Sequence, residues 1–246
     1  MRDVDAIANA VADGLVEQGA EAVAIVGSHA RGDAGPGSDL DLAVIGEGPH
    51  YRLEAHRGLL VSMGWATPAE QRRRLYEPHW LGTHVPGWRD ARIVVDAGGL
   101  AASVQREARA WSWTMVEDEC DRWAAASVAG LSEEACKLGS ALEEHRLSVA
   151  AVQRSLLALQ LARPVALRRR LLYSTENRLW ELVAAEVGPE WRDAQASALG
   201  TAGDELAVGC RSALRLFELA VAEVRPLLDP RESAVVELAL QAIAAL

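Results

Sequence analysis

A glycine–serine pair and two aspartates near the start of the chain are the residue types that phosphate chemistry needs. Gly27 and Ser28 follow a short apolar segment, and Asp39 and Asp41 stand two residues apart at the beginning of another. A glycine lets the backbone approach an anion closely, and backbone N–H groups and a serine hydroxyl donate to phosphate oxygens. Residues two apart on a strand point to the same face, so the two carboxylates would lie side by side.

Two adjacent carboxylates predict a binding site for a divalent metal. On an otherwise apolar strand they repel each other, and the arrangement is unfavourable unless a cation lies between them. Mg²⁺ commonly binds one or two carboxylates together with substrate phosphate oxygens and water. A single Asp-x-Asp pair is also frequent in ordinary turns and strands, so the pair alone leaves a metal site and a plain turn equally open.

The longer motif around these residues is more specific. It reads Gly-Ser-x-x-Arg-Gly and then Ser-Asp-x-Asp-Leu over residues 27–42, and it resembles the signature of the DNA polymerase β-like nucleotidyltransferases. The resemblance implies that Ser28 contacts the phosphates of ATP or another NTP. It also implies that Asp39 and Asp41 hold Mg²⁺. Arg31 would then brace the loop or contact a phosphate.

Further segments resemble the kanamycin nucleotidyltransferase group, whose members adenylylate a hydroxyl of aminoglycosides. The Asp-x-Gly-Gly turn at 96–99 and the Tyr-Ser-Thr stretch at 173–175 are similar to segments of that group. So is a glutamate followed four residues later by a lysine, here Glu133 and Lys137. The resemblance implies that Glu133 is the general base for the attacking hydroxyl and that Lys137 faces the phosphates. A small-molecule hydroxyl acceptor, such as an aminoglycoside, and a homodimer are implied in the same way.

The Glu–Lys spacing also has a structural explanation. Residues i and i+4 share one helical face, and exposed pairs of this kind are abundant, each worth a few tenths of a kcal/mol. Lys137 is, however, the one lysine among the 25 basic residues of the chain. A lysine kept in an arginine-rich sequence favours a functional role. Glu134, Glu143 and Glu144 are alternative candidates for the base.

A third carboxylate is the part of the superfamily pattern that this sequence lacks. The superfamily usually has one on a neighbouring strand, and the apolar stretch expected there, residues 59–65, contains no acidic residue. Asp96, at the end of a later strand, is the candidate replacement as a metal ligand. An aspartate before two glycines equally well caps the following turn or helix. Both interpretations of Asp96 stay open.

The elements around the motif are short strands and helices. Apolar runs predict strands at 22–26, 40–45, 59–63 and 92–95. Helices are expected at 3–19, near 51–58, and from residue 67, where Thr-Pro-Ala-Glu has the cap and first-turn proline of a helix start. From about residue 100 onward only helical spacing remains.

These patterns predict an α+β fold with two domains. Residues 1–110 would form a mixed-sheet nucleotidyltransferase domain, and residues 111–246 an all-helical bundle. A chain of 246 residues is long enough for one large core or two modest ones.

Composition narrows the classes of partner. The formal charge of −10 argues against broad electrostatic binding to nucleic acid. No apolar run has membrane-spanning length, and the first residues contain no apolar signal core. The three cysteines are scattered, so reduced thiols are expected. We therefore expect a cytoplasmic protein that binds neither nucleic acid nor membrane.

Two other functions fit the same motif. Small nucleotidyltransferases of toxin–antitoxin pairs carry it and modify a partner protein in place of a small molecule. A non-catalytic nucleotide-binding protein is the other alternative, and the lack of a third strand carboxylate points to it.

Overall fold

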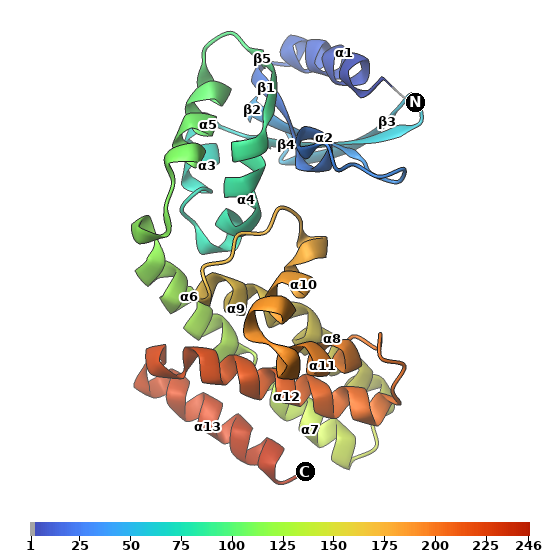
Figure 1. Cartoon of the computed structure of the whole chain (residues 1–246), viewed down its shortest axis with the longest axis vertical. Helices are drawn as coiled ribbons and strands as arrows, with labels where there is room; N and C mark the ends of the chain where they lie inside the picture. The colour runs from blue at the N-terminus through green and yellow to red at the C-terminus, as the bar shows by residue number, and fades with distance from the viewer. Residues whose placement is uncertain (1–2) are drawn as a thin grey trace. The chain divides into compact units, whose positions relative to one another are not determined.

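The computed structural model describes residues 3–246 of the chain. The chain divides into two compact units: the first ends at Met115, and the second runs from Val116 to Leu246. Figure 1 colours both along the sequence. Within residues 3–246 no helix combines the length and the apolar character that crossing a bilayer requires.

The first unit is built on a five-stranded mixed sheet. Its strands are β1 (Ala20–Val26), β2 (Leu40–Gly46), β3 (Tyr51–His56), β4 (Leu59–Ala66) and β5 (Arg92–Asp96). Their order across the sheet is β3-β4-β2-β1-β5. Neighbouring strands are antiparallel except β2 and β4, which are parallel. The central strand β2 is therefore flanked by β1 on one side and by β4 on the other.

Helices cover both faces of this sheet. They are α1 (Val4–Glu17), α2 (Gly27–Arg31), α3 (Pro68–Arg73), α4 (Pro78–Asp90), α5 (Leu100–Ala110) and the short 3₁₀ helix η1 (Trp113–Met115). Buried Ile7, Val11 and Leu15 of α1 join apolar side chains of β1, β2 and β4 in one core. Figure 1 shows α1 along one face and α2 to α5 on the other side. These helices therefore shield the parts of the sheet that they contact from solvent.

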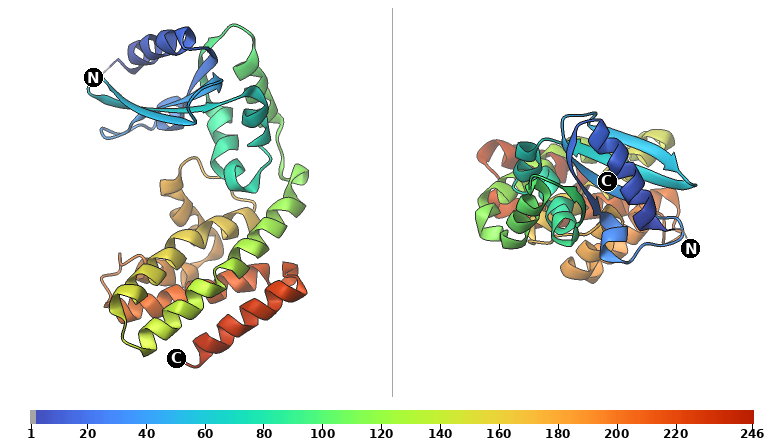
Figure 2. Two further views of the ribbon diagram at one scale, coloured as in Figure 1. Left: turned by 180° about the vertical axis from the view of Figure 1, so that it is seen from behind. Right: turned by 90° about the horizontal axis from the view of Figure 1, so that it is seen from above.

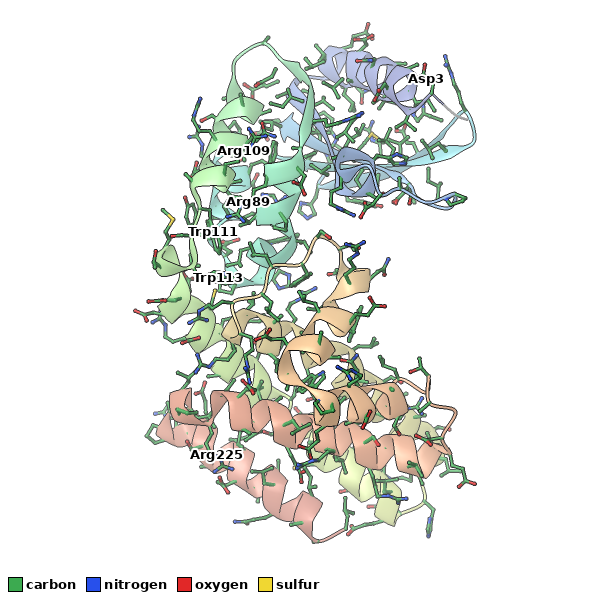
Figure 3. The ribbon with its side chains drawn as sticks, in the orientation of Figure 1. Asp3, Arg89, Arg109, Trp111, Trp113 and Arg225 are labelled. Atoms are coloured by element: carbon green, nitrogen blue, oxygen red, sulfur yellow. The ribbon has the colours of Figure 1, made fainter. Side chains whose placement is uncertain are left out.

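Side chains fasten the helix ends of this unit. Asp3 accepts a hydrogen bond from the backbone N–H of Ala6 and so caps α1. Arg89 of α4 donates to the carbonyl oxygens of Ala108 and Trp111, at 2.8 and 2.9 Å, which occupies acceptors that the end of α5 leaves free. Figure 3 shows this arginine beside the tryptophan, whose ring centroid is 5.7 Å from the guanidinium carbon.

The second unit is helical. It contains α6 (Glu117–Gly130), α7 (Ser132–Glu143), α8 (Leu147–Gln160), α9 (Ala162–Arg168), α10 (Glu176–Val187), α11 (Pro189–Ala198), α12 (Leu206–Val224), η2 (Arg225–Leu227) and α13 (Pro230–Ala244). The long α12 packs against α6, α7, α8, α9, α11 and α13. Its apolar residues, including Phe217 and Leu214, belong to one core with side chains of those helices. Figure 2 shows the bundle from two further sides.

The predicted fold class is confirmed: a mixed sheet is followed by a helical bundle. The four predicted strands are present, and Thr67 forms the predicted capping box with Glu70 at the start of α3. The expected domain limits, 1–110 and 111–246, differ from the two units by the short segment 111–115, which contains η1.

The helix expected near 51–58 is wrong, because this segment forms β3 and a turn. Its polar residues Arg52, Glu54 and His56 alternate with Tyr51, Leu53 and Ala55, which is the period of a strand. Arg57 and Gly58 follow with φ values of 49° and 75°. Two such residues form the tight turn of a hairpin, so β3 folds back along β4.

Candidate functional site

The aspartate pair lies at one end of the central strands. Asp41 is the second residue of β2, and Asp39 immediately precedes the strand. Val26, the last residue of β1, is paired with Asp41 on one side, and Ser62 of β4 is paired with it on the other. The turn that leaves β1 is therefore adjacent to the carboxylates, as the sequence motif requires.

The surroundings of Asp41 disfavour its negative charge. Burial, and after it the charge of Asp39, raises the pKa of Asp41 from an ordinary 3.8 to about 6. A hydrogen bond with the Ser62 side chain and the charge of Arg31 act in the opposite direction on this pKa. A cation placed beside the two carboxylates would remove the unfavourable interaction. The residues present thus fit Mg²⁺, which accepts two carboxylates and completes its shell with other oxygens.

Gly27 brings the backbone directly against Asp41. Its φ is +69°, and a Cβ at this position would overlap the Oδ2 atom of Asp41. An L-residue other than glycine is therefore strained in two ways: by its backbone conformation and by its contact with the carboxylate. The glycine lets the first turn after β1, with Ser28 in it, lie beside the aspartate pair.

Arg31 holds the loop that connects α2 with the aspartates. Its Nη2 atom is 3.1 Å from Oδ1 of Asp33, and only 14% of its side chain is exposed. Gly32, with φ +81°, ends the helix between the two residues. The ion pair is compatible with a bracing role for Arg31, and both this role and the contact with a phosphate stay predictions.

A cavity of about 570 Å³ lies beneath the same loop, lined among others by Val4, His29, Pro36 and Leu59. Its lining includes His29 and Ser38, the sequence neighbours of Ser28 and Asp39, but not Ser28 or the aspartates themselves.

The comparisons with known proteins bear on this end of the sheet. Residues 9–86 match the family model of the nucleotidyltransferase domain. This stretch begins inside α1, contains β1 to β4 and ends within α4, so it includes the glycine–serine turn and both aspartates. This part of the chain is similar to nucleotidyltransferase domains.

One solved structure extends the comparison beyond the nucleotidyltransferase domain. It is a nucleotidyltransferase-like protein from Exiguobacterium sibiricum, 16% identical, with a TM-score of 0.53 over 86% of this chain and 72% of that chain. The likeness shows the fold, and its coverage includes helices of the second unit. No curated protein matches the chain. These findings support the predicted resemblance to the nucleotidyltransferase superfamily. They do not test the predicted resemblance to the kanamycin group.

Asp96 does not join the aspartate pair, which corrects its expected role as a third metal ligand. Strand β5 runs antiparallel to β1 and pairs Asp96 with Ala22, whereas Asp41 pairs with Val26 at the other end of β1. The Asp96 carboxylate accepts hydrogen bonds from the backbone N–H groups of Ala101 and Ala102, at 3.1 and 2.9 Å. It therefore caps α5, the alternative that its place before two glycines left open.

Ser62 occupies the neighbouring-strand position beside the aspartate pair. It is in register with Asp41 across the parallel pair β2–β4, and the sequence analysis did not single it out. The only indication of its position in the sequence is that it is a polar residue in the otherwise apolar stretch 59–65. Within residues 3–246, no group of three or more His, Cys, Asp or Glu side chains is placed to hold a metal. A metal bound at this place would therefore have Asp39 and Asp41 as its carboxylate ligands, and no third.

Glu133 and Lys137 belong to the second unit. They lie one turn apart on α7 and form an ion pair of 2.5 Å, with 70% and 49% of their side chains exposed. The hydrogen bond and the charge of Lys137 lower the pKa of Glu133. These contacts are those of an exposed i,i+4 pair, and the proposed roles in base catalysis and phosphate binding stay predictions.

Proposed function

We propose that the protein is a Mg²⁺-dependent nucleotidyltransferase that transfers a nucleoside monophosphate, from ATP or another NTP, to a hydroxyl group of a small molecule. The observation that carries the proposal is Asp41, whose carboxylate is half-buried beside Asp39 and lies against the turn at Gly27. Both aspartates lie within the matched nucleotidyltransferase domain. A half-buried, mutually repelling pair next to a phosphate-type turn is the arrangement that a metal–triphosphate complex would stabilise.

The residues of the turn at Gly27 and the two aspartates have separate roles in this proposal. Asp39 and Asp41 would hold Mg²⁺, which, when bound, neutralises the charge of the phosphate oxygens. The Ser28 hydroxyl would donate to the triphosphate, and Gly27 allows the close approach of the backbone. Arg31 lies near Asp41, since its charge acts on the pKa of that carboxyl. It therefore adds a positive charge where phosphate would lie.

The proposed reaction is a single displacement at phosphorus. The acceptor oxygen forms a bond with the α-phosphorus, and the bond between that phosphorus and the oxygen of the leaving pyrophosphate breaks. The hydroxyl proton passes to a carboxylate, for which Glu133 is our candidate. Its ion pair with Lys137 lowers its pKa, which makes it a weaker base than an unpaired glutamate. Lys137 would interact with the phosphates, and a homodimer is proposed from the resemblance alone.

Ser62 favours one alternative function. A serine in place of a strand carboxylate beside Asp41 removes a negative charge that would assist metal binding and proton removal. A protein that binds nucleotide without transferring it is consistent with this feature. Turnover distinguishes a transferase from a non-catalytic nucleotide-binding protein, because both would bind Mg²⁺-ATP.

Calorimetric titration with Mg²⁺-ATP tests the metal site. We expect binding to wild type and at least a tenfold weaker affinity in Asp39→Asn and Asp41→Asn, with folding checked by circular dichroism. Asp193→Asn, at an exposed position of α11, is the matched control. Equal affinity in all four proteins would contradict the proposal.

Mass spectrometry of small-molecule hydroxyl acceptors, aminoglycosides among them, then tests transfer. The expected result is a mass gain of one nucleoside monophosphate together with pyrophosphate release. Nucleotide binding without a mass gain in any acceptor would favour the non-catalytic alternative, and a mass gain on a co-expressed protein would favour a protein acceptor.

A further inference from the structure

The sheet face that carries Asp41 continues across β4 and β3. Asp41 is in register with Ser62, and Ser62 is in register with Leu53. Directly paired residues of neighbouring strands point to the same face, so these three form a row across the sheet. Because alternate residues of a strand share a face, Leu60 and Tyr51 lie on this face too.

This surface, which we call the hairpin face, is apolar and open. It consists of Tyr51, Leu53, Ala55, Leu60, Ser62 and Gly64. The tyrosine and the two leucines are 58%, 50% and 52% exposed, and none of the six residues is charged. The charged side chains of β3 alternate onto the opposite face. Exposed apolar side chains gathered in this way usually mark a binding surface.

The chemistry of the proposed reaction places the acceptor over the hairpin face. This step rests on the proposed function. In phosphoryl-type transfer, the attacking and leaving oxygens lie roughly in line on opposite sides of the phosphorus. Ser28 follows the end of β1, where Val26 is paired with Asp41, so a pyrophosphate bound by this turn would lie on the β1 side of Asp41. The attacking hydroxyl would then come from the side of β4 and β3.

We propose that the hairpin face binds an uncharged, apolar part of the acceptor, such as an aromatic ring or a branched alkyl group, next to its reacting hydroxyl. Leu53 and Leu60 supply apolar area, and Tyr51 offers a ring for stacking. A polycationic acceptor would gain nothing from these side chains. The acceptor class is thereby narrowed to hydroxyl compounds with an apolar part, and a wholly polar polyol or polyamine is a poor match.

Ligand-observed NMR with two probe alcohols tests the hairpin face without turnover. The probes are 2-phenylethanol and glycerol, each added to the full chain with Mg²⁺ and a non-hydrolysable ATP analogue. We expect saturation transfer to 2-phenylethanol and none to glycerol. The variants Leu53→Lys and Leu60→Lys should weaken 2-phenylethanol binding at least fivefold. Leu238→Lys on α13, where the leucine is 65% exposed, is the matched control and should bind as wild type does.

Three outcomes would overturn the inference. The first is equal saturation of both alcohols, or no change in the two lysine variants. The second is a parallel loss of Mg²⁺-ATP affinity in those variants, which would assign the face to the nucleotide. The third is a wild-type dimer in sedimentation that Leu53→Lys converts to monomer, because a second copy would then cover the face. Failure of Mg²⁺-ATP to bind wild type, titrated separately, would instead remove the proposed function on which the inference rests.

Discussion

Asp41 and Gly27 depend on each other. Only a residue without a Cβ leaves room for the Asp41 carboxylate, and that carboxylate has a pKa of about 6 because it is buried beside Asp39. The ordinary pKa is 3.8, so in the folded chain without metal the ionised form is disfavoured over the pH range between these values. At neutral pH and without a bound cation, the ionised aspartate pair therefore lowers the stability of the folded chain.

The sign of this effect leads to a stability prediction for Asp41→Asn. Between about pH 4 and pH 6 the folded chain holds a proton that the unfolded chain has lost, so stability falls as pH rises through this window. At pH 8 in EDTA we expect the variant to be more stable than wild type by about 1–3 kcal/mol, allowing for partial solvent screening. Near pH 3.5 the difference should vanish. Urea unfolding at both pH values measures it, with Asp193→Asn as control; a less stable variant at pH 8 would contradict the prediction.

Gly27→Ala should separate backbone strain from the clash with the carboxylate. Gly32 has a φ of +81° and open space where a Cβ would stand, whereas Gly27 has both a positive φ and the contact with Asp41. Both alanine variants should lose about 1–2 kcal/mol of stability. Only Gly27→Ala should also weaken Mg²⁺-ATP binding, by tenfold or more, because it displaces Asp41, a proposed metal ligand. Thermal unfolding and calorimetry give the two readouts, and equal affinities would show that the contact is unimportant.

Strand direction explains which parts of the site the sequence alone could predict. The strands at β1, β2, β4 and β5 and the cap at Thr67 follow from local patterns, and so does the adjacency of the glycine–serine turn and the aspartates, which are joined by a short loop. The place of Asp96 depends on β5 running antiparallel to β1, and the place of Ser62 depends on β4 running parallel to β2. Pairing direction is a tertiary property, so neither contact could be read from spacing.

Asp96→Ala tests the separation of these two ends of the sheet. The aspartate accepts two backbone hydrogen bonds at the start of α5, and loss of such a cap destabilises a protein by about 0.5–2 kcal/mol. We expect that loss in thermal unfolding, with unchanged Mg²⁺-ATP affinity under conditions where the variant is folded. An affinity as low as that of Asp39→Asn would restore Asp96 to the metal site.

At the scale of the whole molecule, the proposed chemistry draws on both units. The proposed metal and phosphate ligands lie in the first unit, and the proposed base lies on α7 of the helical unit. The similarity to the solved structure covers 86% of the chain, so the combination of the two units is part of the shared fold. A division of this kind predicts that nucleotide binding and turnover respond to different substitutions.

Glu133→Gln should lower kcat by about 10²–10⁴-fold, the range for loss of a general base, and leave the Kd for Mg²⁺-ATP unchanged. Lys137→Ala should instead weaken triphosphate binding, since it removes a charge facing phosphate oxygens. Initial rates with an acceptor found by mass gain, together with calorimetry, give the two parameters. Glu143→Gln serves as the comparison, and an unchanged kcat in Glu133→Gln would transfer the assignment to Glu134, Glu143 or Glu144.

The tight turn between β3 and β4 has a consequence for the order in which the protein folds. A hairpin closed by two residues forms in about 1–10 μs and needs no other part of the chain. The segment from β1 to β2 is likewise local. The parallel contact of β4 with β2 comes later, because it closes a longer loop and aligns strands that no short turn connects. Ser62 meets Asp41 only at that step, so we expect the turn proposed to bind the phosphates to lie beside Asp41 before the hairpin face does.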